Sequence, residues 1–572
     1  MSHASTVMRP LSLLLAALLL AGCEKAAAPV EVNVAAINDF HGNLLSNPFS
    51  YKDPAVEGGM VKLKAGGIGA LSGLVAQLRQ QDSELLLIGA GDMIGGSPPI
   101  SSMWADEPTL DALDLMGLKF TAVGNHELDQ GKAELLRQIK GGCESTRPDK
   151  ACQFDKAYKG TTFPYISANL MDKETGKPLF QPYRIERAHG AKIAFVGATL
   201  KNVAAYVSAK SMNGLYTVDE ADAINALLPE LKKQDVDAIV VVIHQGGETP
   251  ERFDQQDCSQ LSGDVVDVVK RLDPQIKVVV SAHTHQGYLC RIGDKLVTQG
   301  ASFGRLMTHL TLKIDTDKHQ LLDVKAENLV VDPQRYAPTE EIAALQKQVE
   351  NRSQAQLGEP LARLGARQVQ RETNDAGESA MGDLIADAQL AATRALGAQV
   401  ALMNLGGMRM DLALEEGQDK VNYGQVAGVQ PFNNTLNIMT LSGAQLRELL
   451  EQQWQTGSMG FYPLQPSASL SYRWDAARPK GQHVIAESLM IDGQPVKPEQ
   501  TYRVTVNSFL ADGGDNFTVL AQASERLDTG LNDLEALIVY LQGRDQAGQP
   551  AGLAEAEQRI QKVGESLAGS DQ

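Results

Sequence analysis

The sequence lacks several features that mark well-known classes of protein. It has no block of basic residues, and its 52 Lys and Arg against 70 Asp and Glu give a formal net charge of −18. A nucleic-acid polymer is therefore disfavoured as a partner, although a few fixed cations would suffice to bind a small anion. Internal repeats and long low-complexity tracts are also absent. The composition, with 43% hydrophobic and 21% charged residues, is ordinary for a folded globular protein. A chain of 572 residues is too long for a single hydrophobic core, so at least two globular domains are expected.

The apolar run near the N-terminus is too short to span a bilayer. Residues 11–21, which follow Arg9, are a run of eleven residues that ends in LLAGC. This ending resembles a bacterial lipobox, in which Cys23 becomes the lipidated first residue of the mature chain. We predict a lipoprotein signal over residues 1–23, with Met8 as an alternative start, and export to a membrane-anchored position facing the periplasm or the cell surface. A buried core helix is the alternative.

Cysteine is scarce, with five in the chain. Assigning Cys23 to lipid leaves Cys143 and Cys152, which flank a charged loop, and Cys258 and Cys290 in another region. An exported protein favours disulfides, and local pairing would join Cys143 to Cys152 and Cys258 to Cys290. A zinc cluster is the alternative, but no CxxC spacing supports it.

What the sequence does have is a set of strand-like runs that end in the same way. The runs VNVAAIN, ELLLIGAG, FTAVG, AIVVVI and KVVVSA have the length and composition of strands buried on both faces. Residues 67–81 and 223–234 lie between such runs and have apolar residues at helical spacing, which predicts layered α/β packing. Such folds bind ligands beyond the carboxyl ends of their strands. The loops at these ends hold Asp39, His41, Asp92, Asn125, His126, His244, His283 and His285.

The side chains at these strand ends share one kind of chemistry. Asp, Asn and His offer the oxygen and nitrogen donors that suit divalent first-row metals, and Asp92 could bridge two ions. Two ions roughly 3.5–4 Å apart can activate water and hold a phosphoryl group for in-line displacement. A single histidine is more often a hydrogen-bonded structural residue. The recurrence of Asp, His and Asn at several strand ends favours a metal site.

The loops DFHGN, GDMIGGSP, GNHELDQG, IHQGG and HTHQG together resemble the metallophosphoesterase signature. In particular they are similar to the two-domain 5′-nucleotidase family, which includes periplasmic UDP-sugar hydrolases and cyclic-nucleotide phosphodiesterases. The resemblance covers about residues 30–540 and implies an α/β fold: a four-layer α/β/β/α catalytic domain and a C-terminal α/β nucleotide-recognition domain. Residues 339–354, with Ile342, Leu345 and Val349 at helical spacing, predict a connecting helix. The expected limits are 30–335 for the catalytic domain, 336–362 for the linker, 363–545 for the second domain and 546–572 for a peripheral polar tail.

The resemblance also implies roles for the strand-end residues. One divalent ion, which could be Zn, Mn, Co or Mg, would take Asp39, His41, Asp92 and His285. A second ion would share Asp92 and take Asn125, His244 and His283. His126 and Asp129 resemble the family's catalytic dyad, in which the carboxylate orients an imidazole that stabilises charge on the phosphoryl oxygens.

Three patches of the second half lie in loops rich in Gly, Asn and Asp. They are MNLGGMRMDL, QPFNNTLNIMTLSGAQLRELL, in which Ser442 and Gln445 form a helix-capping pattern, and NSFLADGGDNF. Aromatic residues are more often core than ligand clamps, but these loops make core packing less expected. In the family, matching positions bind the base, the ribose and the phosphate. This implies that Phe432 and Phe509 sandwich the base. Asn434 and Asp515 would hydrogen-bond the base or the ribose, and Arg409 and Arg371 would bind the phosphate.

The sequence therefore predicts an exported metal-dependent phosphohydrolase that acts on nucleotides, with nucleoside 5′-monophosphates as the expected substrates. The same machinery would serve a 2′,3′-cyclic phosphodiesterase/3′-nucleotidase or a UDP-sugar hydrolase. An inactive nucleotide-binding surface lipoprotein is the alternative outside the enzymes, and the full set of ligand positions argues against it.

Overall fold

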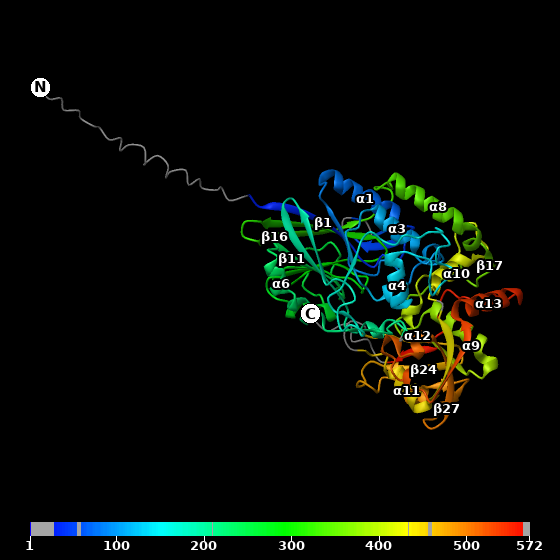
Figure 1. Ribbon diagram of the computed structural model, residues 1–572. Helices are drawn as coiled ribbons and strands as arrows, with labels where there is room; N and C mark the ends of the chain where they lie inside the picture. Colours follow the sequence, from blue (N-terminus) through cyan, green and yellow to red (C-terminus); the bar gives the residue numbers. More distant parts are fainter. Residues whose placement is uncertain are drawn as a thin grey trace.

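The computed structural model describes residues 1, 28–53, 56, 59–208, 210–432, 434–455 and 460–563. Residues 2–23 of the predicted signal segment, including Arg9 and Cys23, lie outside these residues. The chain forms a larger N-terminal part and a smaller C-terminal part, which are drawn in blue to green and in yellow to red in Figure 1. Helix α8 (Glu340–Leu357) follows the first part in the sequence and packs against its surface.

The first of two six-stranded sheets in the N-terminal part contains the strand of the first predicted run. Its parallel strands β1, β4, β5 and β6 run side by side, and β15 and β16 extend the sheet in antiparallel fashion beyond β1. In sheet order the strands are β16 (Gln320–Val330), β15 (Leu306–Asp315), β1 (Val30–Ile37), β4 (Leu86–Gly89), β5 (Thr121–Ala122) and β6 (Tyr165–Ile166).

The second sheet contains the last two predicted runs. Strands β9, β11, β12 and β14 are parallel, and antiparallel β8 and β13 form its edges. In sheet order the strands are β13 (Gly287–Ile292), β14 (Lys295–Gly300), β12 (Val278–Val280), β11 (Ala238–His244), β9 (Ala191–Thr199) and β8 (Tyr183–Ala188).

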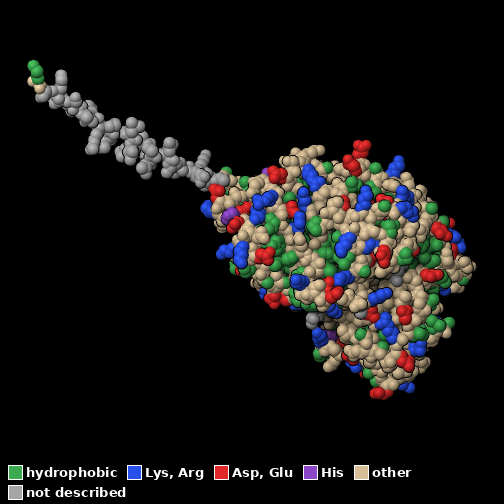
Figure 2. Space-filling model, in the orientation of Figure 1, with side chains coloured by type: hydrophobic (Ala, Val, Ile, Leu, Met, Phe, Trp, Pro, Cys, Tyr) green, Lys and Arg blue, Asp and Glu red, His purple; other side chains and the backbone are tan. Residues whose placement is uncertain are grey.

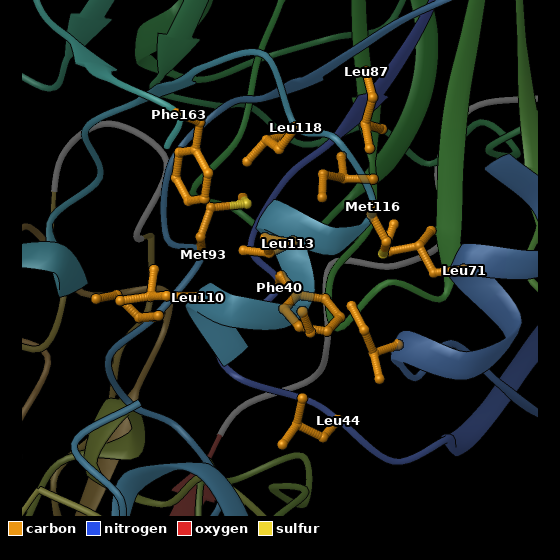
Figure 3. Packing of buried hydrophobic residues seen from close by; sticks show 14 of the residues in the cluster. Phe40, Leu44, Leu71, Leu87, Met93, Leu110, Leu113, Met116, Leu118 and Phe163 are labelled. Atoms are coloured by element: carbon orange, nitrogen blue, oxygen red, sulfur yellow. The ribbon is translucent and has the colours of Figure 1, made fainter. Parts of the chain in front are cut away.

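The two sheets face each other between two layers of helices. Alternate side chains such as Val34, Ile88, Phe195 and Val242 fill the space between the sheets, and every one of them is fully buried. Figure 3 shows part of the core between the first sheet and its helices α1 (Ile68–Gln81) and α3 (Glu107–Leu115). Helix α4 (Gly131–Lys140) adds Leu135 to the same core. Helices α5 (Glu220–Ala226), α6 (Leu228–Lys233) and α7 (Asp264–Arg271) cover the second sheet. The predicted four-layer α/β/β/α arrangement is confirmed.

The helix predicted over residues 223–234 is divided in two. Helix α5 ends at Ala226 and α6 begins at Leu228, with Pro229 in its first turn. Proline has no amide hydrogen to bond the preceding turn, so it is favoured at the start of a helix and disfavoured inside one. The apolar spacing did not reveal this break.

The C-terminal part is a second α/β unit, as predicted. Its central sheet has the order β23 (Gln465–Pro466), β19 (Val400–Met403), β27 (Thr501–Asn507), β22 (Thr435–Ser442) and β28 (Glu525–Asn532). A smaller sheet contains β26 (Gln494–Pro495), β25 (Met490–Ile491), β24 (Leu470–Asp475) and β29 (Ile560–Val563). The covering helices include α9 (Ala380–Thr393), α10 (Tyr423–Val429), α11 (Gly443–Glu451) and α13 (Asp533–Gln546).

Two local predictions are confirmed and one segment differs from expectation. Ser442 and Gln445 form a reciprocal capping box at the start of α11. Disulfides join Cys143 to Cys152 and Cys258 to Cys290. Within the stretch expected as a peripheral tail, Ile560–Val563 form β29 alongside β24, where Ile560 is buried and the neighbouring Arg559 donates to Asp387 at 2.7 Å.

Positive and negative side chains are interspersed over the face of the molecule in Figure 2, in agreement with the absence of a basic block in the sequence. In the part of the chain that the structure describes, no helix combines the length and the apolarity needed to cross a membrane.

Candidate active site

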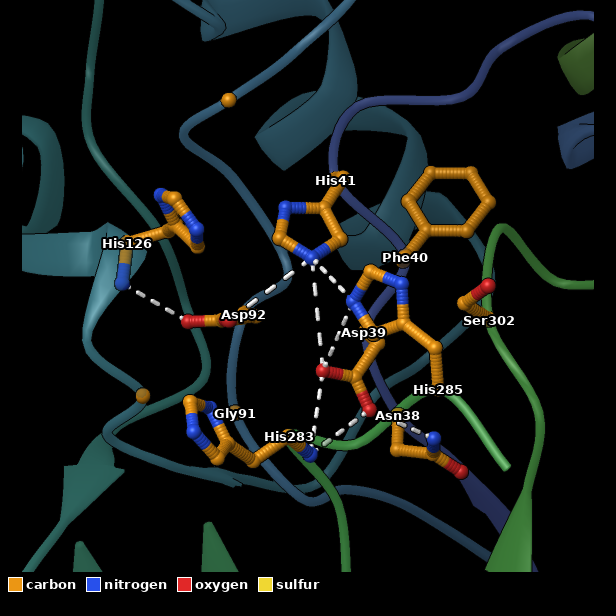
Figure 4. Close-up of polar contacts among 12 residues, drawn as sticks. Asn38, Asp39, Phe40, His41, Gly91, Asp92, His126, His283, His285 and Ser302 are labelled. Atoms are coloured by element: carbon orange, nitrogen blue, oxygen red, sulfur yellow. Dashed lines mark hydrogen bonds and ion pairs between the residues drawn. The ribbon is translucent and has the colours of Figure 1, made fainter. Parts of the chain in front are cut away.

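The carboxyl ends of strands from both sheets meet at one edge of the sandwich. Asp39 and His41 follow β1, Asp92 follows β4, His244 ends β11, and the pair His283 and His285 follows β12. Figure 4 shows the side chains of these loops gathered around one space. Asn125, in the loop after β5, is 2% exposed, and Asp39, Asp92 and His244 are equally buried. The fold therefore brings together all of the residues predicted to bind metal.

The donors fall into two groups that share a boundary at Asp92. Asp39, His41 and His285 offer ligand atoms within 4.8 Å of one another, as do Asp92, His244 and His283. Asp92 Oδ2 lies 3.0 Å from His244 Nε2 and 3.6 Å from His41 Nε2, so its carboxylate reaches both groups. Two adjoining donor sets with a carboxylate between them have the composition of a two-ion site.

Within the described part of the chain, two buried polar atoms at this position make no hydrogen bond of regular geometry. They are Asn125 Oδ1 and His244 Nε2, and the latter faces Asp92 Oδ2 at 3.0 Å. Leaving a buried polar atom unpaired costs about 1–3 kcal/mol, so such atoms call for an additional partner. Both atoms are of the kinds that coordinate divalent first-row cations. The residues therefore fit the metal ions that the sequence predicts.

The second nitrogen of two imidazoles is held by the backbone. His41 Nδ1 lies 2.7 Å from the carbonyl of Gly95, and His244 Nδ1 lies 3.0 Å from that of Ala90. Bonding of Nδ1–H to a carbonyl fixes the ring orientation and presents Nε2 to a cation. Burial lowers the pKa of His41 and His285 well below the ordinary value, which keeps them as the neutral imidazoles that bind metals.

Two residues that sequence reasoning missed hold the carboxylates in place. Asn38 donates to Asp39 Oδ2 at 2.7 Å. The buried carboxylate of Glu127 accepts the amides of Asp92, Met93 and Gly124 at 2.6–2.8 Å, which ties the loop after β4 to the loop after β5. Burial raises the pKa of Glu127 to about 7. Both residues lie inside the recognised loops, but nothing in their spacing distinguishes a positioning residue from a ligand.

Most of the donor residues adopt a backbone conformation that is rare for side chains other than glycine. The φ angles are 48° at Asp39 and His41, 53° at Asp92, 77° at His283 and 58° at His285. A residue held in this region costs roughly 1–3 kcal/mol and persists where the surroundings impose it. Here each strand turns sharply as it ends, which directs its side chain back toward the common space.

His126 and Asp129 form a hydrogen-bonded pair beside the donors. His126 Nδ1 lies 3.0 Å from both carboxylate oxygens of Asp129, whose Oδ2 also accepts the amide of Gly96 at 2.9 Å. Burial alone would lower the pKa of His126, but Asp129 and then Asp92 raise it above the ordinary value. His126 also lies within ligand distance of His41 and Asp92, so it adjoins the donor set as well as Asp129.

Phe432 and Arg409 of the C-terminal part lie beside the His126–Asp129 pair. The Phe432 ring stacks on the imidazole of His126, with centroids 5.7 Å apart and planes inclined by 18°, and the Arg409 guanidinium lies 5.6 Å from the Phe432 centroid. Among the described residues Arg409 Nη2 has no hydrogen-bond partner although it is buried, which suits an anion ligand. Arg371 Nη1 donates to the carbonyls of Met408 and Arg409 and so lies beside it.

The remaining predicted substrate residues have protein partners of their own. Asn434 accepts a hydrogen bond from Ser508 Oγ at 3.1 Å and donates to Asp533, and Asp515 Oδ2 accepts from Asn404 at 2.7 Å. The Phe509 ring packs on the backbone of Gly514. Among the described residues no ring contact joins Phe509 to Phe432, so the base sandwich stays a prediction.

Comparison with known proteins agrees with this architecture. The model of the calcineurin-like phosphoesterases matches residues 32–287, and that of the 5′-nucleotidase C-terminal domain matches residues 353–522. The fold and the site thus define a metal-dependent phosphoester hydrolase. The chain belongs to the two-domain 5′-nucleotidase family of metallophosphoesterases, as the sequence resemblance predicted.

Individual relatives are distant. Endonuclease YhcR of Bacillus subtilis is 30% identical, and the alignment covers 90% of this chain but only 40% of YhcR. The cell wall protein Lmo0130 of Listeria monocytogenes is 28% identical over 96% of this chain and 71% of its own length. Among solved structures, the 5′-nucleotidase precursor of Thermus thermophilus has a TM-score of 0.74 and 25% identity, covering 94% of this chain and all of that one.

Proposed function

We propose that the protein hydrolyses the phosphate ester of nucleotides, with nucleoside 5′-monophosphates as the main substrates. The observation that carries the proposal is the stacking of Phe432 on His126, because it joins the catalytic edge of one part to a loop of the other. A substrate that occupies this boundary would have its phosphate at the donor cluster and its nucleoside against the C-terminal part. The family membership supports the same division of roles.

The donor residues would hold two divalent ions. Asp39, His41, Asp92 and His285 would bind one, and Asp92, Asn125, His244 and His283 the other. When bound, such ions activate water and neutralise charge on the phosphoryl group. Zn, Mn, Co and Mg all suit a mixed nitrogen and oxygen site, so the identity of the metal depends on availability as well as on the ligands.

The chain's own groups would complete the reaction. His126, kept protonated by Asp129, would donate from Nε2 to an oxygen of the phosphoryl group as negative charge develops there. Arg409, whose Nη2 has no partner in the described part of the chain, would bind a phosphoryl oxygen, and Arg371 would support it from a neighbouring loop. Asp129 would hold the imidazole in place throughout.

Phosphate release from a panel of substrates, together with the metal content of the protein, tests the proposal. The panel should include AMP, GMP, UMP, a 2′,3′-cyclic nucleotide, a UDP-sugar and p-nitrophenyl phosphate. The expected result is the highest kcat/KM for the 5′-monophosphates. A higher value for the cyclic nucleotide or the UDP-sugar would replace the proposed substrate with that one. Full metal loading with no hydrolysis of any of them would favour a nucleotide-binding lipoprotein.

We also propose that the protein acts outside the cytoplasm as a lipid-anchored protein. The lipobox-like LLAGC, the two disulfides and the similarity to a cell wall protein support this location. Mass spectrometry of the mature protein should find Cys23 at the N-terminus with attached lipid. An unprocessed N-terminus would contradict the anchor.

The two aromatic residues assigned to the base are expected to respond differently to truncation. Stacking on an aromatic ring contributes roughly 1–3 kcal/mol per base and tolerates different bases, so Phe509→Ala should raise KM for AMP, GMP and UMP by about 5- to 100-fold. Hydrolysis of p-nitrophenyl phosphate should change little, because that substrate has no nucleobase.

Phe432→Ala should raise KM for the same nucleotides and also lower kcat, because the ring rests on His126. The measurement is steady-state kinetics for each substrate. Equal losses on nucleotide and aryl phosphate for Phe509→Ala would assign that ring to core packing.

A further inference from the structure

The two histidines of the second donor set are held in different ways. His244 Nδ1 lies 3.0 Å from the carbonyl of Ala90, which fixes the plane of its ring. His283 has its backbone amide bound to the two oxygens of Asp39, at 3.1 and 3.0 Å, but among the described residues its imidazole makes no hydrogen bond. A metal-binding histidine usually has its second ring nitrogen held by a hydrogen bond. The orientation of the His283 ring therefore depends on other contacts.

The ring of Tyr206 supplies such a contact. Its centroid lies 4.7 Å from that of the His283 imidazole, and the two planes are inclined by 84°. The His244 ring is the second neighbour, at 5.3 Å and 65°. Aromatic pairs in this edge-to-face geometry gain about 0.5–1.5 kcal/mol beyond the area that they bury. Rotation of the His283 ring would disturb both contacts, so they restrain its plane.

Tyr206 is itself held firmly in the segment that follows β9. Val203 and Val207, on either side of it in the sequence, are buried in the core beside the first sheet, and the Tyr206 ring packs against the same core. Farther along the segment, Ser211 Oγ donates to the carbonyl of Asp129 at 2.9 Å. A side chain that is locked by its own packing can fix the position of its neighbour.

The C-terminal part lies against the turn that precedes Tyr206. This turn is η2 (Val203–Ala205), and it contacts η7 (Gly514–Asn516), which contains the buried Asp515. Asp515 is in turn bound by Asn404 at 2.7 Å. Tyr206 therefore follows a turn that both parts of the molecule support, and it presents its ring to a predicted metal ligand.

We propose that Tyr206 is a positioning residue that orients His283 and thereby sets the affinity of the second metal position. Its ring contact takes the place of the hydrogen bond that holds His244. This role rests on the metal site of the proposed function, and it is independent of which phosphate ester the protein hydrolyses. Loss of the ring should weaken the metal position that contains His283 and leave the position that contains His41 and His285 unchanged.

Titration of the metal-free full-length protein with Co²⁺, followed by its visible absorption, measures the two positions. The wild-type protein should bind two ions. Tyr206→Ala should bind one of them as the wild type does and the other about 10- to 100-fold more weakly, the usual effect of removing a group that orients a metal ligand. Tyr206→Phe retains the ring and should restore the wild-type affinity. Circular dichroism checks that the variants are folded.

Two further variants complete the experiment. His283→Ala should lose the same ion that Tyr206→Ala binds weakly, which identifies the affected position. Tyr51→Ala is the matched control, because the half-buried Tyr51 ring makes a similar perpendicular contact, 5.2 Å from the Phe253 ring at 88°, outside the donor sets. It should bind both ions normally. Turnover of p-nitrophenyl phosphate by Tyr206→Ala should be low at limiting Co²⁺ and recover at saturating Co²⁺, because all of the ligands remain.

The outcomes separate this role from the metal site itself. If His283→Ala loses an ion while Tyr206→Ala binds both ions normally, the role of Tyr206 is overturned and the metal site stands. If His283→Ala binds two ions as tightly as the wild type, the metal assignment fails and the role of Tyr206 with it. An equal loss of both ions in Tyr206→Ala, or a defect that Tyr206→Phe shares, would contradict positioning through the ring.

Discussion

Replacing Asp92 by alanine is expected to abolish metal binding and phosphate release together while the fold is retained. The Asp92 carboxylate lies closest to both donor sets among the described carboxylates, at 3.0 Å from His244 Nε2 and 3.6 Å from His41 Nε2. Its Oδ1 also accepts the amide of His126 at 2.8 Å, so its loss releases the dyad loop as well. Two-ion catalysis supplies several kcal/mol of charge stabilisation, so kcat/KM should fall by about 10³-fold or more.

Elemental analysis of the purified variant measures the metal, and circular dichroism checks the fold. Asp111→Asn is the matched control, because Asp111 is an aspartate with acidic neighbours on α3, outside the site, where burial raises its pKa to about 6. That variant should keep metal and activity. Normal turnover and full occupancy of both metal positions in Asp92→Ala would refute the bridging role.

His126→Ala is expected to lower kcat by roughly 10²-fold or more, with a smaller effect on KM, which is the usual scale for a positioned proton donor or charge-stabilising group. Asp129→Asn should give a weaker defect of the same kind. The pH dependence provides a further check. Asp129 raises the pKa of His126, so removing its charge lowers that pKa, and the protonated imidazole is lost at lower pH. The alkaline limb of the pH profile of kcat should therefore move to lower pH in Asp129→Asn.

His309→Ala is the control for this prediction. His309 Nδ1 lies 3.0 Å from Glu327 Oε1, a histidine–carboxylate pair of similar geometry on β15 and β16, outside the site. It should leave kcat and the pH profile unchanged. An effect of His126→Ala confined to KM would contradict a role in the transition state.

The sequence predicted the layers of the fold and the convergence of the donors because both follow from simple periodicities. Continuous Val- and Ile-rich runs define buried strands, and parallel strands must present their following loops at the same edge. The two disulfides followed from the number and separation of the cysteines and from the expected export. Family membership followed from the loops themselves, which combine rare residue types in a fixed order.

Other features depend on contacts between residues distant in the sequence and left no local signal. The carboxylate of Glu127 binds three amides from two loops, and Tyr206 packs on His283 from the loop of another strand. The strand β29 lies in a stretch whose polar composition predicts a surface tail, and one buried Ile with a buried Arg is too small a pattern to detect. The roles of the site residues in binding and catalysis remain predictions.

The positive φ angles of the donor residues bear on how this site would change in a lineage that no longer needed it. Glycine would relieve the backbone strain at Asp39, His41, Asp92, His283 and His285. A single substitution at any of these positions would therefore remove a strain that the present side chain maintains. In a descendant released from catalysis, drift toward glycine or asparagine is expected at these positions first, ahead of the buried strands. Thermostability screens that do not also select for turnover should enrich the same exchanges, and the variants they return would be stable and inactive.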